Sequence, residues 1–170
     1  MKNRALASCA KTMAALLLTA LATGAGTAHA AGDSSFVAHY TTASLSAQEQ
    51  TAGNLLNSDR ARYGLAPLVI DPELCRIARI KSQDMRDNQY FAHTSPTYGD
   101  VRSMLRRFGY AFTASGENIA HHATIEKAQA AFLSSPGHRR NIMSGTYTKV
   151  GMGAAIDAQG YVYLTQIFVR

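Results

Sequence analysis

The chain ends in two strand-like segments joined by a short turn, and this arrangement limits the fold more than any other feature. Residues 147–156 and 161–169 are separated by Asp157-Ala158-Gln159-Gly160, which is typical of a hairpin turn. In the second segment the side chains alternate between two faces. One face carries Tyr161, Tyr163, Thr165 and Ile167, and the other carries Val162, Leu164, Gln166 and Phe168. A small antiparallel sheet must bury such faces, so we expect helices to pack against it.

Helical segments are expected upstream of this hairpin. They are residues 47–63, 72–88, 101–108 and 125–133. Ser46 and Glu49 form a capping-box pattern at the first start, Asp71 precedes Pro72 at the second, and Thr124 caps the last. Residues 65–70 read as an extended connection, a strand is expected from Tyr110 toward Glu117, and Ser135-Pro136-Gly137 ends the last helix. This order predicts an α+β domain, a three-layer α-β-α sandwich around a small antiparallel sheet.

The second helical segment has an apolar stripe. Leu74, Ala78 and Met85 recur on one face, and charged residues that include Lys81 and Asp84 are expected to occupy much of the remaining surface. Cys75 is predicted to be a small buried residue of this helix.

The first thirty residues have the order of a secretory signal peptide. Lys2, Arg4 and Lys11 precede a short apolar run, and Ala28-His29-Ala30 is a small-residue cleavage pattern. The run is shorter than the ~20 apolar residues that span a bilayer, and no other stretch reaches that length. We therefore expect cleavage near Ala30, no transmembrane segment in the mature chain, and a secreted, periplasmic or cell-envelope location.

The remaining chain is expected to contain one domain. Residues 31–46 are small and polar and predict a flexible N-terminal arm, followed by a domain over residues 47–170. Cleavage removes Cys9 and leaves Cys75 as the only cysteine, so no internal disulfide is expected. We expect a monomer.

Composition excludes several classes of protein. Hydrophobic residues make up 46% and charged residues 16%, which is a globular composition. The formal net charge of +6 includes the three basic residues of the leader. Neither zinc-finger spacing nor interleaved basic and aromatic residues are present, so no nucleic-acid partner is predicted.

The residues best suited to chemistry lie in segments rich in glycine and proline. They are His93 in Phe91–Pro96, Glu117 in Gly116–Ala120, and His138 after Ser135-Pro136-Gly137. Histidine and glutamate side chains bind divalent metals such as zinc or transfer protons. The spacing itself matches no established metal or nucleophile motif, and the adjacent His121 and His122 are expected to be exposed loop residues.

These segments resemble the CAP superfamily, also called SCP-like extracellular proteins. That family includes cysteine-rich secretory proteins, insect antigen 5 and plant pathogenesis-related 1 proteins, and the chain is most similar to its short bacterial branch. The resemblance covers about Ala52 to Phe168. The matching segments begin with Asn57 to Leu68 and continue through Phe91-Ala92-His93-Thr94-Ser95-Pro96, Gly116-Glu117-Asn118-Ile119-Ala120, Ser135 to Met143, Val150 to Gly153 and Leu164 to Phe168.

The resemblance implies an α-β-α sandwich with a cleft that in eukaryotic members holds two His and two Glu and can bind a divalent metal. His93 matches the first His, and Glu117 matches the Glu of the GEN motif. The second Glu is missing from Phe132–Ser135, and Tyr163 stands in place of the last His. The resemblance nominates His138 instead, which gives His93, Glu117 and His138 as metal ligands. Tyr163 and Gln166 either line the cleft or are ordinary sheet residues.

Three functions are compatible with this sequence. The first is a secreted binding module whose His/Glu cleft holds a divalent metal, a small lipid or a peptide. The second is a metal-assisted hydrolase acting on peptide or cell-wall bonds, which needs three ligands and a base. The third is a non-catalytic envelope interaction protein. The His and Glu residues occur without an evident nucleophile, so we rank the binding module first and favour a non-enzymatic role, while the metal-assisted hydrolase stays open.

Overall fold

The computed structural model describes residues 44–170. The expected signal peptide at 1–30 and most of the expected arm at 31–46 lie outside these residues. The elements in chain order are α1 (Ala47–Arg62), β1 (Val69–Ile70), α2 (Pro72–Asp87), α3 (Val101–Arg107), β2 (Ser115–His122), α4 (Ile125–Ser134), α5 (Pro136–Met143), β3 (Lys149–Ile156) and β4 (Val162–Val169).

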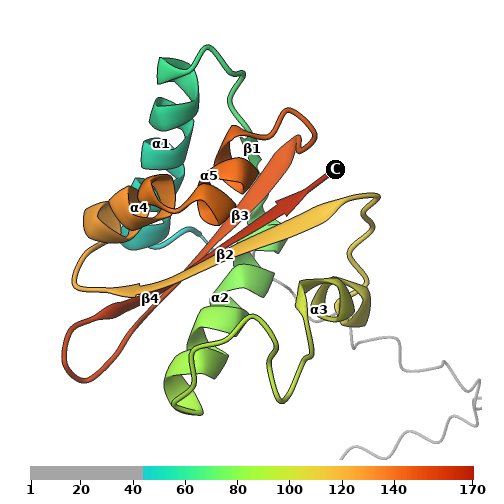
Figure 1. Ribbon diagram of the computed structural model, residues 1–170. Coiled ribbons are helices and arrows are strands. Elements are labelled where there is room, and N and C mark those ends of the chain that lie inside the picture. The colour runs from blue at the N-terminus through green and yellow to red at the C-terminus, as the bar shows by residue number, and fades with distance from the viewer. Residues whose placement is uncertain (1–43) are drawn as a thin grey trace, which may run out of the picture. The chain divides into compact units, whose positions relative to one another are not determined.

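The strands form a single sheet in the order β1-β3-β4-β2, which Figure 1 shows. Strand β4 pairs antiparallel with both β2 and β3, as expected from the hairpin. The two-residue strand β1 pairs parallel with β3 at the opposite edge from β2. This edge strand lies within the segment expected to be only an extended connection, because two residues carry no periodic pattern that the sequence could reveal.

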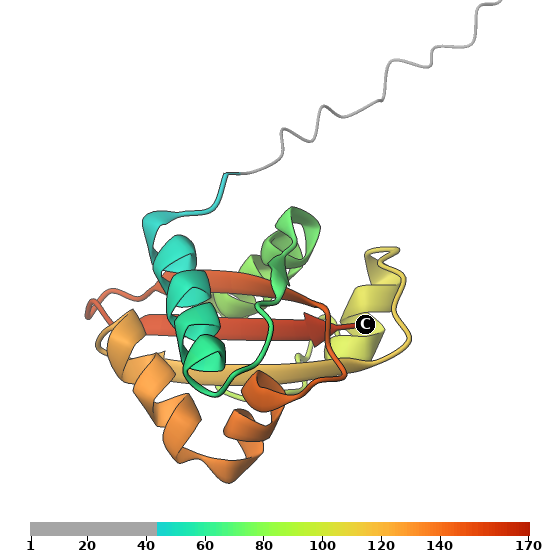
Figure 2. The ribbon, with the colours of Figure 1, turned by 90° about the horizontal axis from the view of Figure 1, so that it is seen from above.

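Helices cover both faces of the sheet, which confirms the α+β sandwich (Figure 2). Helices α2 and α3 bury one set of core residues, which includes Leu74, Met104 and Ile167. Helices α1, α4 and α5 bury another set, which includes Leu56 and Phe132. Strand β4 supplies side chains to both sets, in agreement with the predicted alternation of its two faces.

Helix α2 lies unusually close to strand β3. A Cβ atom added at Gly153 would stand 2.0 Å from the carbonyl carbon of Ala78, and one added at Gly151 would stand 2.3 Å from that of Leu74. Only glycine permits this approach of two backbones. The contact fixes α2 against the sheet, and with it the polar residues that α2 directs toward β2 and β4.

The local signals at the helix starts are confirmed. The Ser46 hydroxyl accepts a hydrogen bond from the Glu49 N–H while the Glu49 side chain accepts one from the Ser46 N–H. Asp71 and Thr124 cap α2 and α4 as predicted. Cys75 is fully buried, also as predicted.

Two sequence expectations are wrong about where elements begin. The Ser135-Pro136-Gly137 segment ends α4, but it also starts α5, because proline is well tolerated at the first position of a helix. Strand β2 begins at Ser115 rather than Tyr110 and continues to His122. His121 and His122 are therefore strand residues, and the aromatic ring of Tyr110 packs against the core beneath α2 and α3 from an irregular segment.

Candidate functional site

The centre of the candidate site is an ion pair between an exposed histidine and a buried glutamate. His93 Nδ1 lies 2.8 Å from Glu117 Oε1. The Glu117 side chain is 4% exposed, whereas that of His93 is 59% exposed. The hydrogen bond to Glu117 raises the pKa of His93 above its ordinary value, against the opposing effect of burial. Because Glu117 engages Nδ1, the exposed ring has Nε2 left to meet a ligand.

The sheet determines which way Glu117 faces. Glu117 pairs with Ile167 across the β2–β4 ladder, and directly paired residues share a face. Ile167 belongs to the core under α2, so Glu117 also faces α2. Its second carboxylate oxygen, Oε2, is buried and accepts no hydrogen bond within the described residues. The charge of this carboxylate is balanced by His93 and, through space, by Lys81.

Lys81 supplies part of that balance and holds the segment that carries His93. The side chain is fully buried on α2. Its ammonium donates hydrogen bonds to the carbonyl oxygens of Ala92 and His93 at 2.8 and 3.1 Å, and to the Tyr90 hydroxyl at 3.2 Å. Burial lowers the pKa of Lys81, and the nearby charge of Glu117 partly restores it. Lys81 is thus a buried cation on the α2 side of the site, and its charge acts on Glu117.

The expectation that Lys81 and Asp84 face solvent is wrong. Lys81 is fully buried and Asp84 is 7% exposed. Positions 74, 78, 81 and 85 follow a four-three-four spacing that places all of them on one helical stripe, so the periodicity contained the signal for Lys81. Its positive charge instead favoured a prediction of solvent exposure, because lysine is seldom buried without partners.

Asp84 fixes the rest of the segment between α2 and α3. Its carboxylate accepts hydrogen bonds from Ser95 Oγ at 2.6 Å, from Asn88 Nδ2 at 2.8 Å, from Thr97 Oγ1 at 3.2 Å and from the Tyr90 hydroxyl. Burial would raise the pKa of Asp84, but these four bonds outweigh it and hold the pKa below its ordinary value. The loop that carries His93 is therefore anchored at both Lys81 and Asp84.

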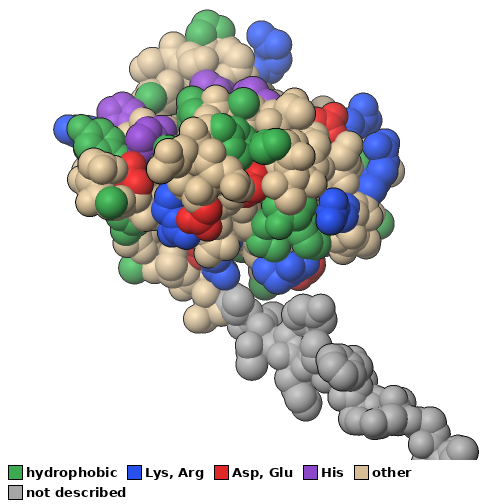
Figure 3. Space-filling model, turned by 90° about the horizontal axis from the view of Figure 1, so that it is seen from below, with side chains coloured by type: hydrophobic (Ala, Val, Ile, Leu, Met, Phe, Trp, Pro, Cys, Tyr) green, Lys and Arg blue, Asp and Glu red, His purple; other side chains and the backbone are tan. Residues whose placement is uncertain are grey.

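His138 lies near His93 but in a different environment. It belongs to α5, and its ring meets the Phe132 ring edge-to-face with the centroids 5.1 Å apart. Burial lowers the pKa of His138, and the positive charge of His93 lowers it further. The site thus contains two imidazoles with opposite pKa shifts. Figure 3 shows histidine side chains gathered toward one border of the face seen from below.

The three predicted ligands do not form a metal centre. Within residues 44–170, no group of three or more His, Cys, Asp or Glu side chains is arranged to hold a metal ion. One oxygen of Glu117 is already engaged by His93, and its other oxygen is buried. The donor set as it stands does not fit a three-ligand zinc site. Metal binding by His93, Glu117 and His138 is therefore not confirmed.

The residue after Glu117 faces the other side of the sheet. Asn118 is fully buried, and its Nδ2 donates to the His138 carbonyl at 3.1 Å and to Gln166 Oε1 at 3.0 Å. Asn141 Nδ2 donates in turn to Asn118 Oδ1 at 2.8 Å and to the Glu117 carbonyl at 3.2 Å. Asn118 and Asn141 therefore join the main chain of the site to α5.

These hydrogen bonds continue into the interior. Gln166 Nε2 donates to Gln129 Oε1 at 2.9 Å, and Gln129 Nε2 donates to Asp59 Oδ2 at 2.8 Å. We call Asn141, Asn118, Gln166, Gln129 and Asp59 the amide network. Gln166 is fully buried within it and reaches the site only through Asn118. Sequence reasoning missed Asn141, Gln129 and Asp59, because their partners are far away in the chain.

Tyr163 lies in another group of side chains. Its ring stacks on that of His121, its partner across the β2–β4 ladder, with the centroids 4.0 Å apart. Phe91 lies on the same side, with its centroid 6.4 Å from that of Tyr163. The structure therefore separates the five predicted site residues into the His93–Glu117–His138 region, the buried Gln166 and the stacked Tyr163.

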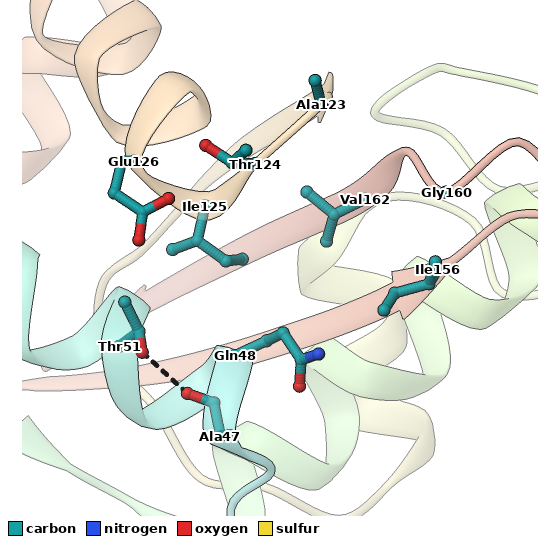
Figure 4. A pocket seen from close by; sticks show the side chains of 10 residues that line it. All are labelled: Ala47, Gln48, Thr51, Ala123, Thr124, Ile125, Glu126, Ile156, Gly160 and Val162. Atoms are coloured by element: carbon teal, nitrogen blue, oxygen red, sulfur yellow. Dashed lines mark hydrogen bonds between the residues drawn. The ribbon is translucent and has the colours of Figure 1, made fainter.

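An apolar pocket lies apart from the predicted site. Figure 4 shows it between the first turns of α1 and α4 and the β3–β4 hairpin. Its volume is about 310 Å³. Ile125, Ile156 and Val162 supply apolar lining, whereas Thr51 and Glu126 contribute polar groups. None of the five predicted site residues lines this pocket.

The three-layer α+β arrangement is shared with a solved SCP domain. An extracellular protein containing an SCP domain from Bacillus anthracis has a TM-score of 0.68 and 35% sequence identity to this chain, covering 72% of this chain and 40% of the other. The cysteine-rich secretory protein family, CAP, matches residues 54–168. The chain belongs to this family.

Two relatives from Bacillus subtilis (strain 168) are similar in sequence. The uncharacterized protein YkwD is 45% identical over 111 residues, covering 65% of this chain and 43% of the relative. The uncharacterized membrane protein YlbC is 35% identical over 118 residues, covering 69% of this chain and 33% of the relative. This chain thus spans less than half the length of either relative. Among residues 44–170, no helix combines the length and apolar character needed to cross a bilayer.

Proposed function

We propose that this protein is a secreted binding module whose His93–Glu117–His138 region holds an extended peptide segment. The observation that carries the proposal is the pairing of an exposed imidazole with a buried carboxylate, opposite a second imidazole with the reverse pKa shift. A protonated His93 donates hydrogen bonds, whereas a neutral His138 has one donor and one acceptor nitrogen. A peptide backbone offers carbonyl and N–H groups that match both.

The polar character of the region favours a peptide over a lipid. A lipid needs an apolar cavity, and the apolar pocket of Figure 4 has none of the site residues in its lining. The donor set also does not fit a three-ligand metal centre. Our proposal therefore includes no metal, either for binding or for hydrolysis. We rank the hydrolase and the envelope interaction protein below the peptide-binding module.

Secretion is supported from two sides. The leader has the order of a signal peptide. The similar Bacillus anthracis protein is described as extracellular. One Bacillus subtilis relative is described as a membrane protein, and this chain covers 33% of that protein.

A random octapeptide library on beads tests the proposal. The purified protein is expected to enrich a subset of sequences, and His93→Gln and Glu117→Gln are expected to lose that enrichment while circular dichroism shows an unchanged fold. His122→Gln is the matched control, since His122 lies in the same strand but pairs across the sheet with Val162. Enrichment that survives in both site variants would overturn the proposal.

Zinc titration by calorimetry separates the peptide site from a metal site. We expect no micromolar zinc binding by the purified protein. Micromolar binding that disappears in both His93→Ala and His138→Ala would contradict our interpretation, and would show that the two imidazoles move together to share an ion.

A further inference from the structure

A second hollow lies at the far end of α2, beside the β3–β4 hairpin. Its volume is about 430 Å³, within the range of small-molecule sites. Arg86 and Gln89 line it from the end of α2, His121 and Tyr163 line it from the sheet, and Gln159 lines it from the hairpin turn. We call it the hairpin hollow. His93, Glu117 and His138 are not part of its lining, so it is separate from the proposed peptide site.

One wall of the hairpin hollow belongs to a row of aromatic rings. The His121 and Tyr163 rings are nearly parallel, at an interplanar angle of 18°. Tyr161 adjoins this stack, with its centroid 5.6 Å from that of His121, and Phe91 adjoins both rings, with its centroid 6.5 Å from that of His121 and 6.4 Å from that of Tyr163. Phe91 is 52% exposed and Tyr161 is 46% exposed. A monomeric protein seldom exposes such a contiguous set of rings unless they meet a ligand.

The remaining lining carries hydrogen-bonding groups whose charges are already paired. Arg86 Nε donates to Asp87 Oδ1 at 2.7 Å. His121 Nε2 lies 2.7 Å from Asp157 Oδ2, and Asp157 also accepts from the main chain of the hairpin turn. The hollow therefore offers planar polar side chains, and its guanidinium is already engaged by Asp87. This chemistry disfavours a lipid chain, which needs an apolar lining, and an anion, which needs unpaired cations.

The backbone at the rim is unusual. Gln89 has φ 52°, and it is the only residue other than glycine with a positive φ among the described part of the chain. Glycine or asparagine is the ordinary choice at the end of a helix in this conformation. Residues held in this region of backbone conformation are strained and concentrate at ligand sites. Here the conformation brings a carboxamide to the rim of the hairpin hollow.

We propose that the hairpin hollow is a saccharide-binding subsite. A sugar ring has an apolar C–H face, which the Tyr163–His121 stack accommodates, and peripheral hydroxyl groups, which act as both donors and acceptors. Gln89 and Gln159 carry carboxamides that satisfy both roles, and the Arg86–Asp87 pair adds a donor and an acceptor. The ligand is a neutral oligosaccharide, either free or as the end of a surface polysaccharide.

The test is a two-dimensional ¹H–¹⁵N NMR titration of the purified protein with chitotriose, cellotriose and maltotriose in separate arms at millimolar concentrations. At least one sugar is expected to shift the amides of residues 86–89, 121, 157–159 and 163, and to leave those around His138 unchanged. A pull-down with insoluble chitin and cellulose separates a polysaccharide end from a free oligosaccharide. Absence of shifts with all three sugars, or shifts that map elsewhere, would overturn the proposal.

Variants sharpen the result. Tyr163→Leu is expected to weaken binding of the active sugar about tenfold, the scale of one aromatic contact. Gln159→Ala is expected to weaken it about fivefold, the scale of one hydrogen bond. Gln159 lies in an exposed turn, so its variant keeps the test valid if Tyr163→Leu disturbs the sheet. Tyr63→Leu is the matched control, because Tyr63 is also an exposed tyrosine, at 54%, and lies directly after α1, away from the hollow. Equal affinity of Gln159→Ala, Tyr63→Leu and the parent would contradict the assignment.

Discussion

Glu117 and Asn118 are neighbours in β2, yet they serve two very different polar regions. Glu117 faces α2, where it holds the exposed ring of His93. Asn118 faces α4 and α5, where it belongs to the amide network. In the amide network each side chain is paired with another buried group of the domain. In the candidate site, Glu117 is paired with His93, and the ring of His93 is exposed to solvent.

This difference separates a structural polar cluster from a binding one. Buried polar groups must be hydrogen-bonded, and a fully paired network has nothing left to offer a ligand. The His93–Glu117 pair satisfies the carboxylate in part and presents an imidazole outward. Asn141 connects the two regions, because it donates to both the Glu117 carbonyl and Asn118 Oδ1. The network thus supports the main chain from which the site projects.

The largest expected effect is in the amide network. Asn118→Ala removes the hydrogen bonds that Asn118 makes with Gln166 Oε1, Asn141 Nδ2 and the His138 carbonyl, so we expect a loss of about 2–4 kcal/mol in the free energy of unfolding. Urea denaturation followed by circular dichroism measures it. Asn54→Ala, on the exposed surface of α1, is the control and should show no loss. Equal stability of the two variants would mean that the network is not structural.

A smaller effect is expected behind the site. Lys81→Met keeps an apolar stem but removes the donor to the Ala92 and His93 carbonyls, so we expect a loss of about 1–3 kcal/mol. Hydrogen exchange should accelerate in residues 90–95 and stay unchanged in β3. Uniform acceleration throughout the domain would show that Lys81 supports the core as a whole and not the segment that carries His93.

His93 and His138 should make the free energy of unfolding depend on pH in opposite directions. The raised pKa of His93 contributes stability below the ordinary histidine pKa, and this contribution is lost as the pH rises through the raised value. The lowered pKa of His138 disfavours protonation in the folded state, so the protein loses stability as the pH falls through the ordinary histidine pKa toward the lowered value. Unfolding free energies of the parent, His93→Gln and His138→Gln between acid and neutral pH measure both slopes.

We expect each of these differences to stay below about 1 kcal/mol, because the His93 ring is exposed to solvent and the His138 ring is half-buried. The stability advantage of the parent over His93→Gln should shrink as the pH rises. The advantage over His138→Gln should grow. Slopes of the same sign in both variants would contradict the contrast between the two rings.

The smallest effect is expected at Ser115, on the same face of β2 as Glu117. Its hydroxyl is buried without a hydrogen-bond partner in the described part of the chain. Ser115→Ala removes this unpaired group, so we expect no loss and a gain of up to about 1 kcal/mol in the free energy of unfolding. Thermal denaturation detects the change. A clear loss would reveal a partner for this hydroxyl that forms in solution.

The sequence predicted what depends on near neighbours. Ser46, Asp71 and Thr124 cap helices through residues two or three positions away, so their signals lie within short segments. The alternation in β4 is equally local. The resemblance to a known family, in contrast, was needed to bring His93 and Glu117 together across 24 residues.

The sequence could not predict features that depend on distant partners. Gln129 and Asp59 meet over a separation of 70 residues, and nothing in the spacing marks either one. Lys81 lies on the apolar stripe of α2, but a buried lysine needs partners, and these partners are carbonyls of a loop that has no sequence signature. The opposite environments of His93 and His138 likewise depend on how α5 packs beside β2.

A pH titration of the histidine ring resonances by NMR, in the parent and in Glu117→Gln, tests the central claim most directly. Our account places the pKa of His93 above the ordinary histidine value and that of His138 below it. Replacing Glu117 should lower the pKa of His93, because the buried carboxylate is the main cause of its shift. If His93 titrates at the ordinary value in the parent, or is unchanged in Glu117→Gln, the His93–Glu117 pair is not the organising feature of this site.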